Sequence, residues 1–97
     1  MALSSKNKQK LKGLAHSLKP TIIIGKDGLS DGTIDSINIA LESRELIKIK
    51  FNSHREEKTY LSEKIETLCE ASLVGSIGNI LILFKQNEDK EKRKINI

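Results

Sequence analysis

Sulfur, aromatic rings and long apolar runs are all scarce in this chain of 97 residues. The single cysteine, Cys69, excludes an internal disulfide, and without a CxxC motif or a histidine pair nearby we interpret it as a partly buried small residue. A membrane span needs about 20 consecutive apolar residues, and no run here approaches that length. The first ten residues lack the apolar stretch of a signal peptide. We therefore expect a cytoplasmic protein with no membrane partner.

Aromatic residues make up only 3% of the chain, and histidine occurs twice. Phe51, Tyr60 and Phe84 are too few for the aromatic platform on which some sheets stack nucleic-acid bases. His16 and His54 stand in no nucleophile or metal-binding motif. We therefore predict no enzymatic activity, no metal ion, no cofactor and no small-molecule substrate.

Lysine, in contrast, is abundant, and its distribution is more informative than the net charge of +4. Residues 1–28 hold six lysines and one acidic residue, a charge of +5. The rest of the chain holds 11 basic and 12 acidic residues, a charge of −1. An isoelectric point near 9.3 with lysines gathered at one end is typical of proteins that bind polyanions. Small lysine-rich domains without such a ligand are also common.

Hydrophobic spacing predicts one domain with three helices and four strands. Helices are expected at residues 4–18, 30–44 and 55–72, and strands at 21–24, 46–51, 73–77 and 80–84. The order α-β-α-β-α-β-β with right-handed crossovers predicts an α/β fold, a four-stranded mixed sheet and its helices in one pair of layers. Three strands would be parallel, and a hairpin turn at Gly78-Asn79 would add an antiparallel fourth.

Several details of packing also follow from the apolar pattern. The run at residues 21–24 is of the kind buried on both faces of a parallel sheet. The core-facing stripe of the first helix comprises Leu11, Leu14, Ala15 and Leu18, and that of the third helix comprises Leu61, Ile65, Leu68 and Ser72, with Cys69 beside it. The third helix also carries five glutamates, and we expect it to face away from any nucleic acid.

Composition changes abruptly after Lys85, where a highly charged segment replaces the apolar strands. We predict a folded domain over residues 1–85. Residues 86–97 are predicted to form a flexible or loosely docked tail, because they offer so little apolar surface to bury. Ile95 and Ile97 are the residues able to pin its end.

The stretch Gly25-Lys26-Asp27-Gly28 joins the first predicted strand to a helix that Ser30 can cap. Glycines permit close backbone approach, and a helix N-terminus favours anions, so this loop is a candidate phosphate site. It fits neither the dinucleotide fingerprint nor the P-loop. Its spacing does match the GxxG clamp with which KH domains grip nucleotide backbone. A simple strand-to-helix turn is the alternative interpretation.

Lysines of the first helix are the second candidate element. Lys6 and Lys10 fall on one line of this helix and Lys8 and Lys12 on a neighbouring line, with no acidic residue to offset them. The stripe is either a phosphate-binding surface or an ordinary solvated face. Secondary candidates, depending on which sheet face is open, are Lys48, Lys50 and Lys85.

An ordered set of motifs resembles the YhbY family of bacterial proteins, which are stand-alone CRM (chloroplast RNA splicing and ribosome maturation) domains. It comprises Leu11-Lys12-Gly13-Leu14-Ala15-His16, Leu18-Lys19-Pro20, Gly25-x-x-Gly28-Leu29 and Glu45-Leu46-Ile47-Lys48-Ile49-Lys50. The similarity runs from about Leu3 to Lys85. In the family, a basic residue is frequent at the position of Asn79, so here a phosphate contact from that hairpin does not carry over directly.

The resemblance implies a fold similar to the C-terminal domain of translation initiation factor three. It also implies RNA binding, in association with precursors of the large ribosomal subunit, through the loop of residues 25–28 and the basic first helix. We therefore expect a monomeric, non-catalytic protein that binds ribosomal RNA through phosphate geometry. The alternative is a protein-interaction module that uses the acidic third helix on an assembly factor or ribosomal protein.

Overall fold

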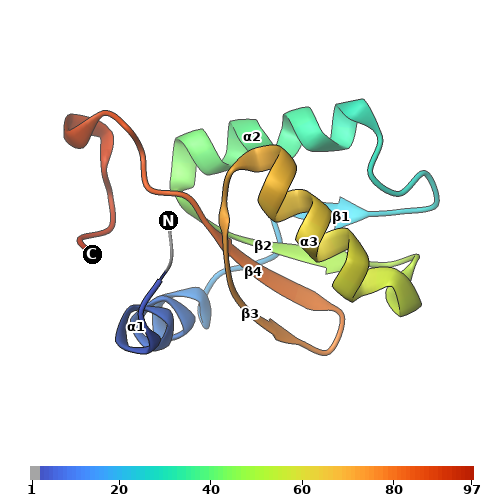
Figure 1. Ribbon diagram of the computed structural model, residues 1–97, viewed down its shortest axis with the longest axis horizontal. Helices are drawn as coiled ribbons and strands as arrows, with labels where there is room; N and C mark the ends of the chain where they lie inside the picture. Colours follow the sequence, from blue (N-terminus) through green and yellow to red (C-terminus); the bar gives the residue numbers. More distant parts are fainter. Residues whose placement is uncertain (1–2) are drawn as a thin grey trace.

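The computed structural model describes residues 3–97 and contains the three helices and four strands that the sequence predicts (Figure 1). Two single 3-10 turns, η1 and η2, are additional. The elements in chain order are α1 (Ser5–Ala15), β1 (Ile22–Ile24), α2 (Asp31–Arg44), β2 (Leu46–Phe51), η1 (Arg55–Glu57), α3 (Lys58–Cys69), β3 (Ser72–Ile77), β4 (Ile80–Phe84) and η2 (Lys90–Lys92).

Serine caps start the first two helices, as their sequences indicate. The hydroxyl oxygens of Ser4 and Ser30 accept hydrogen bonds from the N–H groups of Asn7 (3.1 Å) and Thr33 (3.2 Å). The third predicted helix is shorter than expected. It opens with η1, and α3 ends at Cys69 because Glu70 adopts a left-handed conformation with φ of 51°.

The sheet has the strand order β1-β2-β4-β3. β1 pairs with β2 in parallel, whereas β4 is antiparallel to both β2 and β3. The first three strands therefore run in one direction, as predicted, and β4 lies between the second and the third. Their carboxyl ends meet at one edge of the sheet, together with the Gly78-Asn79 turn of the hairpin (Figure 1).

Helices cover both faces of the sheet, so the expected single pair of layers is wrong (Figure 1). α2 and α3 pack on one face over residues such as Ile47, Ile49 and Leu83. α1 packs on the other face, where Leu11 and Ala15 contact a cluster comprising Leu46, Val74, Ile82 and Phe84. Because β4 is apolar on both sides, each of its faces requires a covering helix.

Three apolar side chains are more exposed than the sequence suggested. Ile23 is 57% exposed because β1 is an edge strand that α1 does not cover, so burial on both faces is wrong for this strand. Leu14 is 44% exposed and Leu68 56%. In α3, the inward line continues from Ile65 to Cys69, four residues on, which leaves Leu68 on the outer side.

The C-terminal segment, residues 85–97, lies against the domain. Glu45, at the junction of α2 and β2, is 1% exposed and its carboxylate accepts three backbone N–H groups. The donors are Asn87 (2.7 Å), Lys94 (2.6 Å) and Ile95 (3.0 Å). Ile95 and Ile97 pack against the α1 cluster, at the end where the sequence allows docking. Within residues 3–97, no helix is long and apolar enough to cross a membrane.

Candidate nucleic-acid interface

The loop of residues 25–28 leaves the carboxyl end of β1 and leads into α2. A tight turn closes it, in which the Gly28 N–H donates to the Gly25 carbonyl oxygen (3.1 Å). Gly28 has a φ of +62°, which glycine adopts without strain, whereas Gly25 has a negative φ and open space beside it. In residues 3–97, no acceptor pairs with the backbone N–H of Lys26 or Asp27. Two amide donors are therefore available to an anion.

The N-terminus of α2 contributes less positive charge to the loop than the sequence pattern implied. The Ser30 cap already takes the N–H of Thr33, and Asp31 places a carboxylate in the first turn. Positive charge at the loop must therefore come from side chains, namely Lys26 and the groups that surround it.

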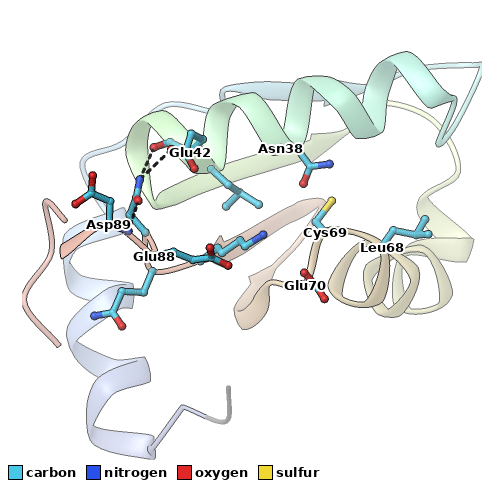
Figure 2. Close-up of a pocket in the computed structure, with 11 residues that line it drawn as sticks. Asn38, Glu42, Leu68, Cys69, Glu70, Glu88 and Asp89 are labelled. Carbon is cyan, nitrogen blue, oxygen red and sulfur yellow. Dashed lines mark hydrogen bonds between the residues drawn. The ribbon is translucent and has the colours of Figure 1, made fainter. Parts of the chain in front are cut away.

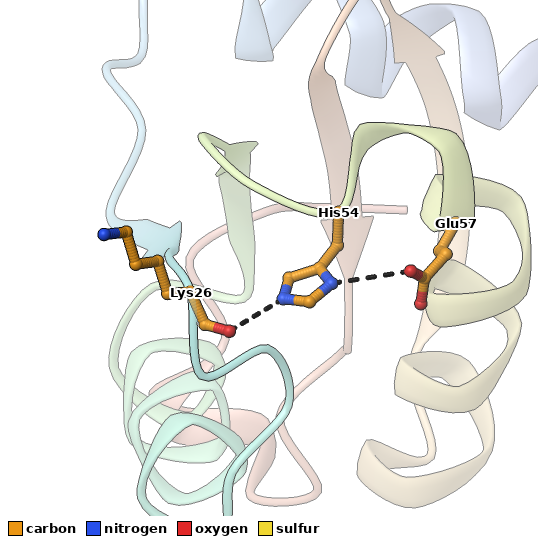
Figure 3. Close-up of polar contacts among 3 residues, drawn as sticks. All are labelled: Lys26, His54 and Glu57. Atoms are coloured by element: carbon orange, nitrogen blue, oxygen red, sulfur yellow. Dashed lines mark hydrogen bonds and ion pairs between the residues drawn. The ribbon is translucent and has the colours of Figure 1, made fainter.

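His54 is the residue of this region that the sequence analysis missed. It lies in the β2–α3 connection in a left-handed conformation (φ 59°), and its ring joins two segments (Figure 3). Nε2 is 2.8 Å from the carbonyl oxygen of Lys26, and Nδ1 is 3.5 Å from Oε1 of Glu57. These acceptors, the Lys26 carbonyl first, raise the pKa of His54 by favouring the imidazolium form. In the sequence, Asn52-Ser53-His54 indicated only a turn.

A second group of cations lies on the α1 face of the sheet, beyond the part that α1 covers. Lys48 and Lys50 alternate with the inward-facing residues of β2 and so point to this face. Lys50 stands in one cross-strand row with Ile23, Ile80 and Ile77. Of these, Ile77 is 69% exposed. The open sheet face is therefore the part of the α1 face around Lys50 that α1 does not cover, and it lies next to the loop.

The lysines of α1 divide into two flanks. Lys12 extends over β3, where a Cβ added at Gly75 would lie 2.6 Å from the Lys12 Cε. Lys8 precedes Lys12 by one helical turn and shares its flank, whereas Lys10 is directed to the tail and donates to the Asn96 carbonyl oxygen (2.7 Å). Lys6 is exposed. Lys12 thus lies nearest to the open sheet face, while Lys10 serves the tail.

Lys48 has a structural partner as well. Its Nζ donates to the carbonyl oxygen of Leu18 (2.9 Å), in the connection from α1 to β1. Because this contact holds the connection against β2, the Lys48 ammonium is only partly free for another ligand.

Two further cations gather at the hairpin turn. Asn79 donates from Nδ2 to the Phe51 carbonyl oxygen (3.1 Å), which places the turn beside the end of β2. Arg55 and Lys58 line a shallow hollow of about 390 Å³ with Gly78 and Asn79. Lys58 also donates to the Gly78 carbonyl oxygen. The start of α3 therefore brings positive charge to this edge, although the rest of that helix is acidic.

Lys85 lies apart from the other predicted site residues. It lines a groove of about 550 Å³ between α2, the end of α3 and the tail, shown in Figure 2. The charged residues around it are otherwise acidic: Glu42, Glu70, Glu88 and Asp89. Cys69 also lines this groove, and burial raises the pKa of its thiol, although Lys85 acts in the opposite direction. Nothing brings Lys85 to the loop of residues 25–28.

The fold and the residues around the 25–28 loop define a class of protein: a small α/β domain with a glycine-bounded loop and lysines beside an open sheet face. The family model for the CRS1 / YhbY (CRM) domain matches residues 3–85. The chain belongs to this family, as the sequence motifs predicted.

Individual relatives agree with the family. A Haemophilus influenzae protein named RNA-binding protein is 42% identical over 88 residues, covering 90% of this chain and 89% of its own length. The Bacillus subtilis protein YqeI, also named for RNA binding, is 38% identical over 96 residues, with 98% of both chains covered. A solution structure of a hypothetical protein from Staphylococcus aureus has a TM-score of 0.79 at 29% identity, and covers 98% of this chain and 100% of its own.

Proposed function

We propose that this chain is a non-catalytic RNA-binding protein whose interface comprises the 25–28 loop and the open sheet face beside it. The observation that carries the proposal is the pair of free amides at Lys26 and Asp27, placed next to Lys50 and His54. Phosphate oxygens accept from backbone amides and from cations alike. The names of the relatives, which refer to RNA binding, support the same function.

The RNA that we propose as the ligand is ribosomal RNA in precursors of the large subunit, bound in the cytoplasm by a monomer. The support is the resemblance to the YhbY family and the character of the interface. Amides and lysines read phosphate positions, which favours a folded RNA of defined shape over a short sequence motif.

The non-catalytic part of the proposal rests on His54, which is the histidine of the interface. Both of its ring nitrogens face an acceptor, the Lys26 carbonyl and the Glu57 carboxylate. While the ring is charged, both nitrogens carry protons that point to these acceptors, so the imidazolium cannot act as a general base on a bound substrate.

The Gly28→Asp substitution tests the loop. Aspartate tolerates left-handed φ better than most residues, so we expect the circular dichroism spectrum of the folded domain to be retained. The added carboxylate would repel a phosphate, and RNA affinity should fall on the order of tenfold. Gly28→Asn is the matched control: it adds a side chain of the same shape without charge, and should weaken binding much less. Unchanged RNA affinity in a folded Gly28→Asp protein would mean that the loop is only a turn.

A further inference from the structure

A groove of about 760 Å³ opens between the end of α1, the connection to β1 and the C-terminal segment. Its charged lining residues are all basic: Lys19, Arg44 and Lys94. Its apolar lining residues are Leu14, Leu18, Leu46 and Ile95. None of these residues was a candidate for function in the sequence.

The side chains of the groove's three cations are unpaired in the part of the chain that the structure describes. Within residues 3–97, none of their side chains forms an ion pair or a hydrogen bond. Glu45, which follows Arg44 in the sequence, is buried, and its carboxylate accepts the N–H groups of Lys94 and Ile95. Three unpaired positive charges around an apolar floor are complementary to a ligand with an apolar face and negative charges at its edge.

The groove also lies in line with the proposed interface. Thr21 forms one of its walls and is four residues before Gly25, a span of about 13 Å along an extended chain at about 3.3 Å per residue. Between them, Ile23 exposes its side chain on the same sheet face as Lys50. A single extended strand of nucleic acid along β1 would therefore reach both the groove and the loop.

We propose that this groove binds an unpaired nucleotide of the RNA, with its base against the apolar floor and its flanking phosphates on Lys19, Arg44 and Lys94. The proposal rests on the RNA-binding function proposed above. A base can lie on this floor only if its face is free, which excludes a base stacked inside a duplex. The protein would then bind RNA at a junction between a structured part and a single-stranded part.

The experiment compares two RNA probes on the full chain, a ten-nucleotide oligouridine and a blunt ten-base-pair duplex. The variant Lys19→Gln/Arg44→Gln/Lys94→Gln removes the charges of the groove. We expect its affinity for oligouridine to fall on the order of tenfold, with a change of less than about threefold for the duplex. The matched control, Lys64→Gln/Lys90→Gln/Lys92→Gln, removes three exposed charges outside the groove and should change both affinities by less than about threefold.

Three outcomes would overturn the proposal. Equal losses in the groove variant and the control would mean that only net charge matters. Equal losses for oligouridine and duplex would mean that the groove does not select unpaired nucleotides. A polyglutamate peptide serves as a third probe. If the groove variant loses binding to this peptide while its oligouridine binding is unchanged, the groove is an acidic-peptide site instead. A wild-type protein that binds neither RNA would instead refute the proposed function itself.

A gain-of-affinity variant tests the apolar floor independently. Leu14 is 44% exposed, so Leu14→Phe should fold normally and present an aromatic face to the base. We expect tighter oligouridine binding by severalfold or more, because bases stack on aromatic rings. The duplex affinity should stay the same. Unchanged oligouridine affinity in the folded variant would show that no base lies on Leu14.

Discussion

At the scale of single residues, His54 links the loop of the proposed interface to the start of α3. As an imidazolium it donates from both nitrogens, to the Lys26 carbonyl and to Glu57. The neutral ring carries a proton on only one nitrogen, so one of the two contacts is no longer a hydrogen bond. Because the pKa of His54 is raised, the charged form persists to a higher pH than for a free histidine.

RNA affinity should therefore depend on pH through His54. As the pH rises through the folded pKa, above the ordinary value of about 6.5, the interface loses one positive charge and His54 loses one of its two hydrogen bonds, so binding should weaken. His54→Gln can still donate to the Lys26 carbonyl but carries no charge, and should flatten the profile. His16→Gln is the control for the other histidine. Fluorescence anisotropy with RNA between pH 5.5 and pH 8.5 tests this; an identical slope in His54→Gln would refute it.

Single residues are also where the sequence was least informative. The Ser30 cap and the glycine at position 28 were predictable because local backbone chemistry fixes them. The contact between His54 and Lys26 was not, because it joins positions 28 residues apart. The exposure of Ile23 depends on which strand forms the sheet edge and on where α1 lies, and neither is encoded in residues 21–24.

At the scale of elements, a buried carboxylate holds the C-terminal segment, together with the packing of Ile95 and Ile97 and the hydrogen bond from Lys10. Burial raises the pKa of Glu45, but the N–H groups of Asn87, Lys94 and Ile95 and the charge of Arg93 outweigh it, so its pKa is lowered. The polar composition of residues 86–97 conceals this docking, because the donors are backbone groups and the acceptor lies 42 to 50 residues earlier. The flexibility of residues 86–97 stays a prediction.

Glu45→Gln should destabilise the domain and release this segment. The amide keeps the size of the side chain but loses the charge that strengthens three hydrogen bonds, at a cost of about 1–3 kcal/mol in the free energy of unfolding. The pKa of Glu45 is lower in the folded protein than in the unfolded chain. The extra stability of the wild type over Glu45→Gln should therefore be fully present above the unfolded pKa, and should disappear as the pH falls through the folded pKa. Urea unfolding at pH 7 and pH 3 measures this. Hydrogen exchange at Lys94 and Ile95 reports the release.

The control for this experiment is Glu63→Gln, an exposed position on α3. It makes the same chemical change without a buried partner and should alter stability by no more than about 0.5 kcal/mol. Equal destabilisation by the two substitutions, or unchanged exchange at Lys94, would show that Glu45 does not hold the segment.

At the scale of the whole molecule, charge is divided between regions. The α1 face and the loop edge carry Lys12, Lys26 and Lys50, whereas the groove between α2 and α3 is rimmed by acidic residues. The sequence predicted this division from the +5 charge of residues 1–28, since charge totals do not depend on contacts. It could not place Lys85, because that required the strand order and the position of the tail.

Binding should depend on salt in proportion to the phosphates contacted. We expect the logarithm of RNA affinity to fall linearly with the logarithm of salt concentration, by about 0.7 per contact for single strands. Lys26→Gln should reduce that slope by about one contact, whereas Lys64→Gln, on α3, should leave it unchanged. A salt-independent affinity would contradict the proposed interface as a whole.

The central place of β4 implies a particular order of events when the chain is made. β4 is the last of the four strands in the chain, yet within residues 3–97 β3 pairs only with β4, and β2 otherwise pairs only with the short strand β1. Until residue 84 has left the ribosome, these two strands have no common neighbour. A chain ending at Ile77 should therefore be unfolded by circular dichroism, whereas one ending at Lys85 should fold with reduced stability. Folding is then postponed until residue 84 has left the ribosome, and the chain reaches its binding-competent form only after that point.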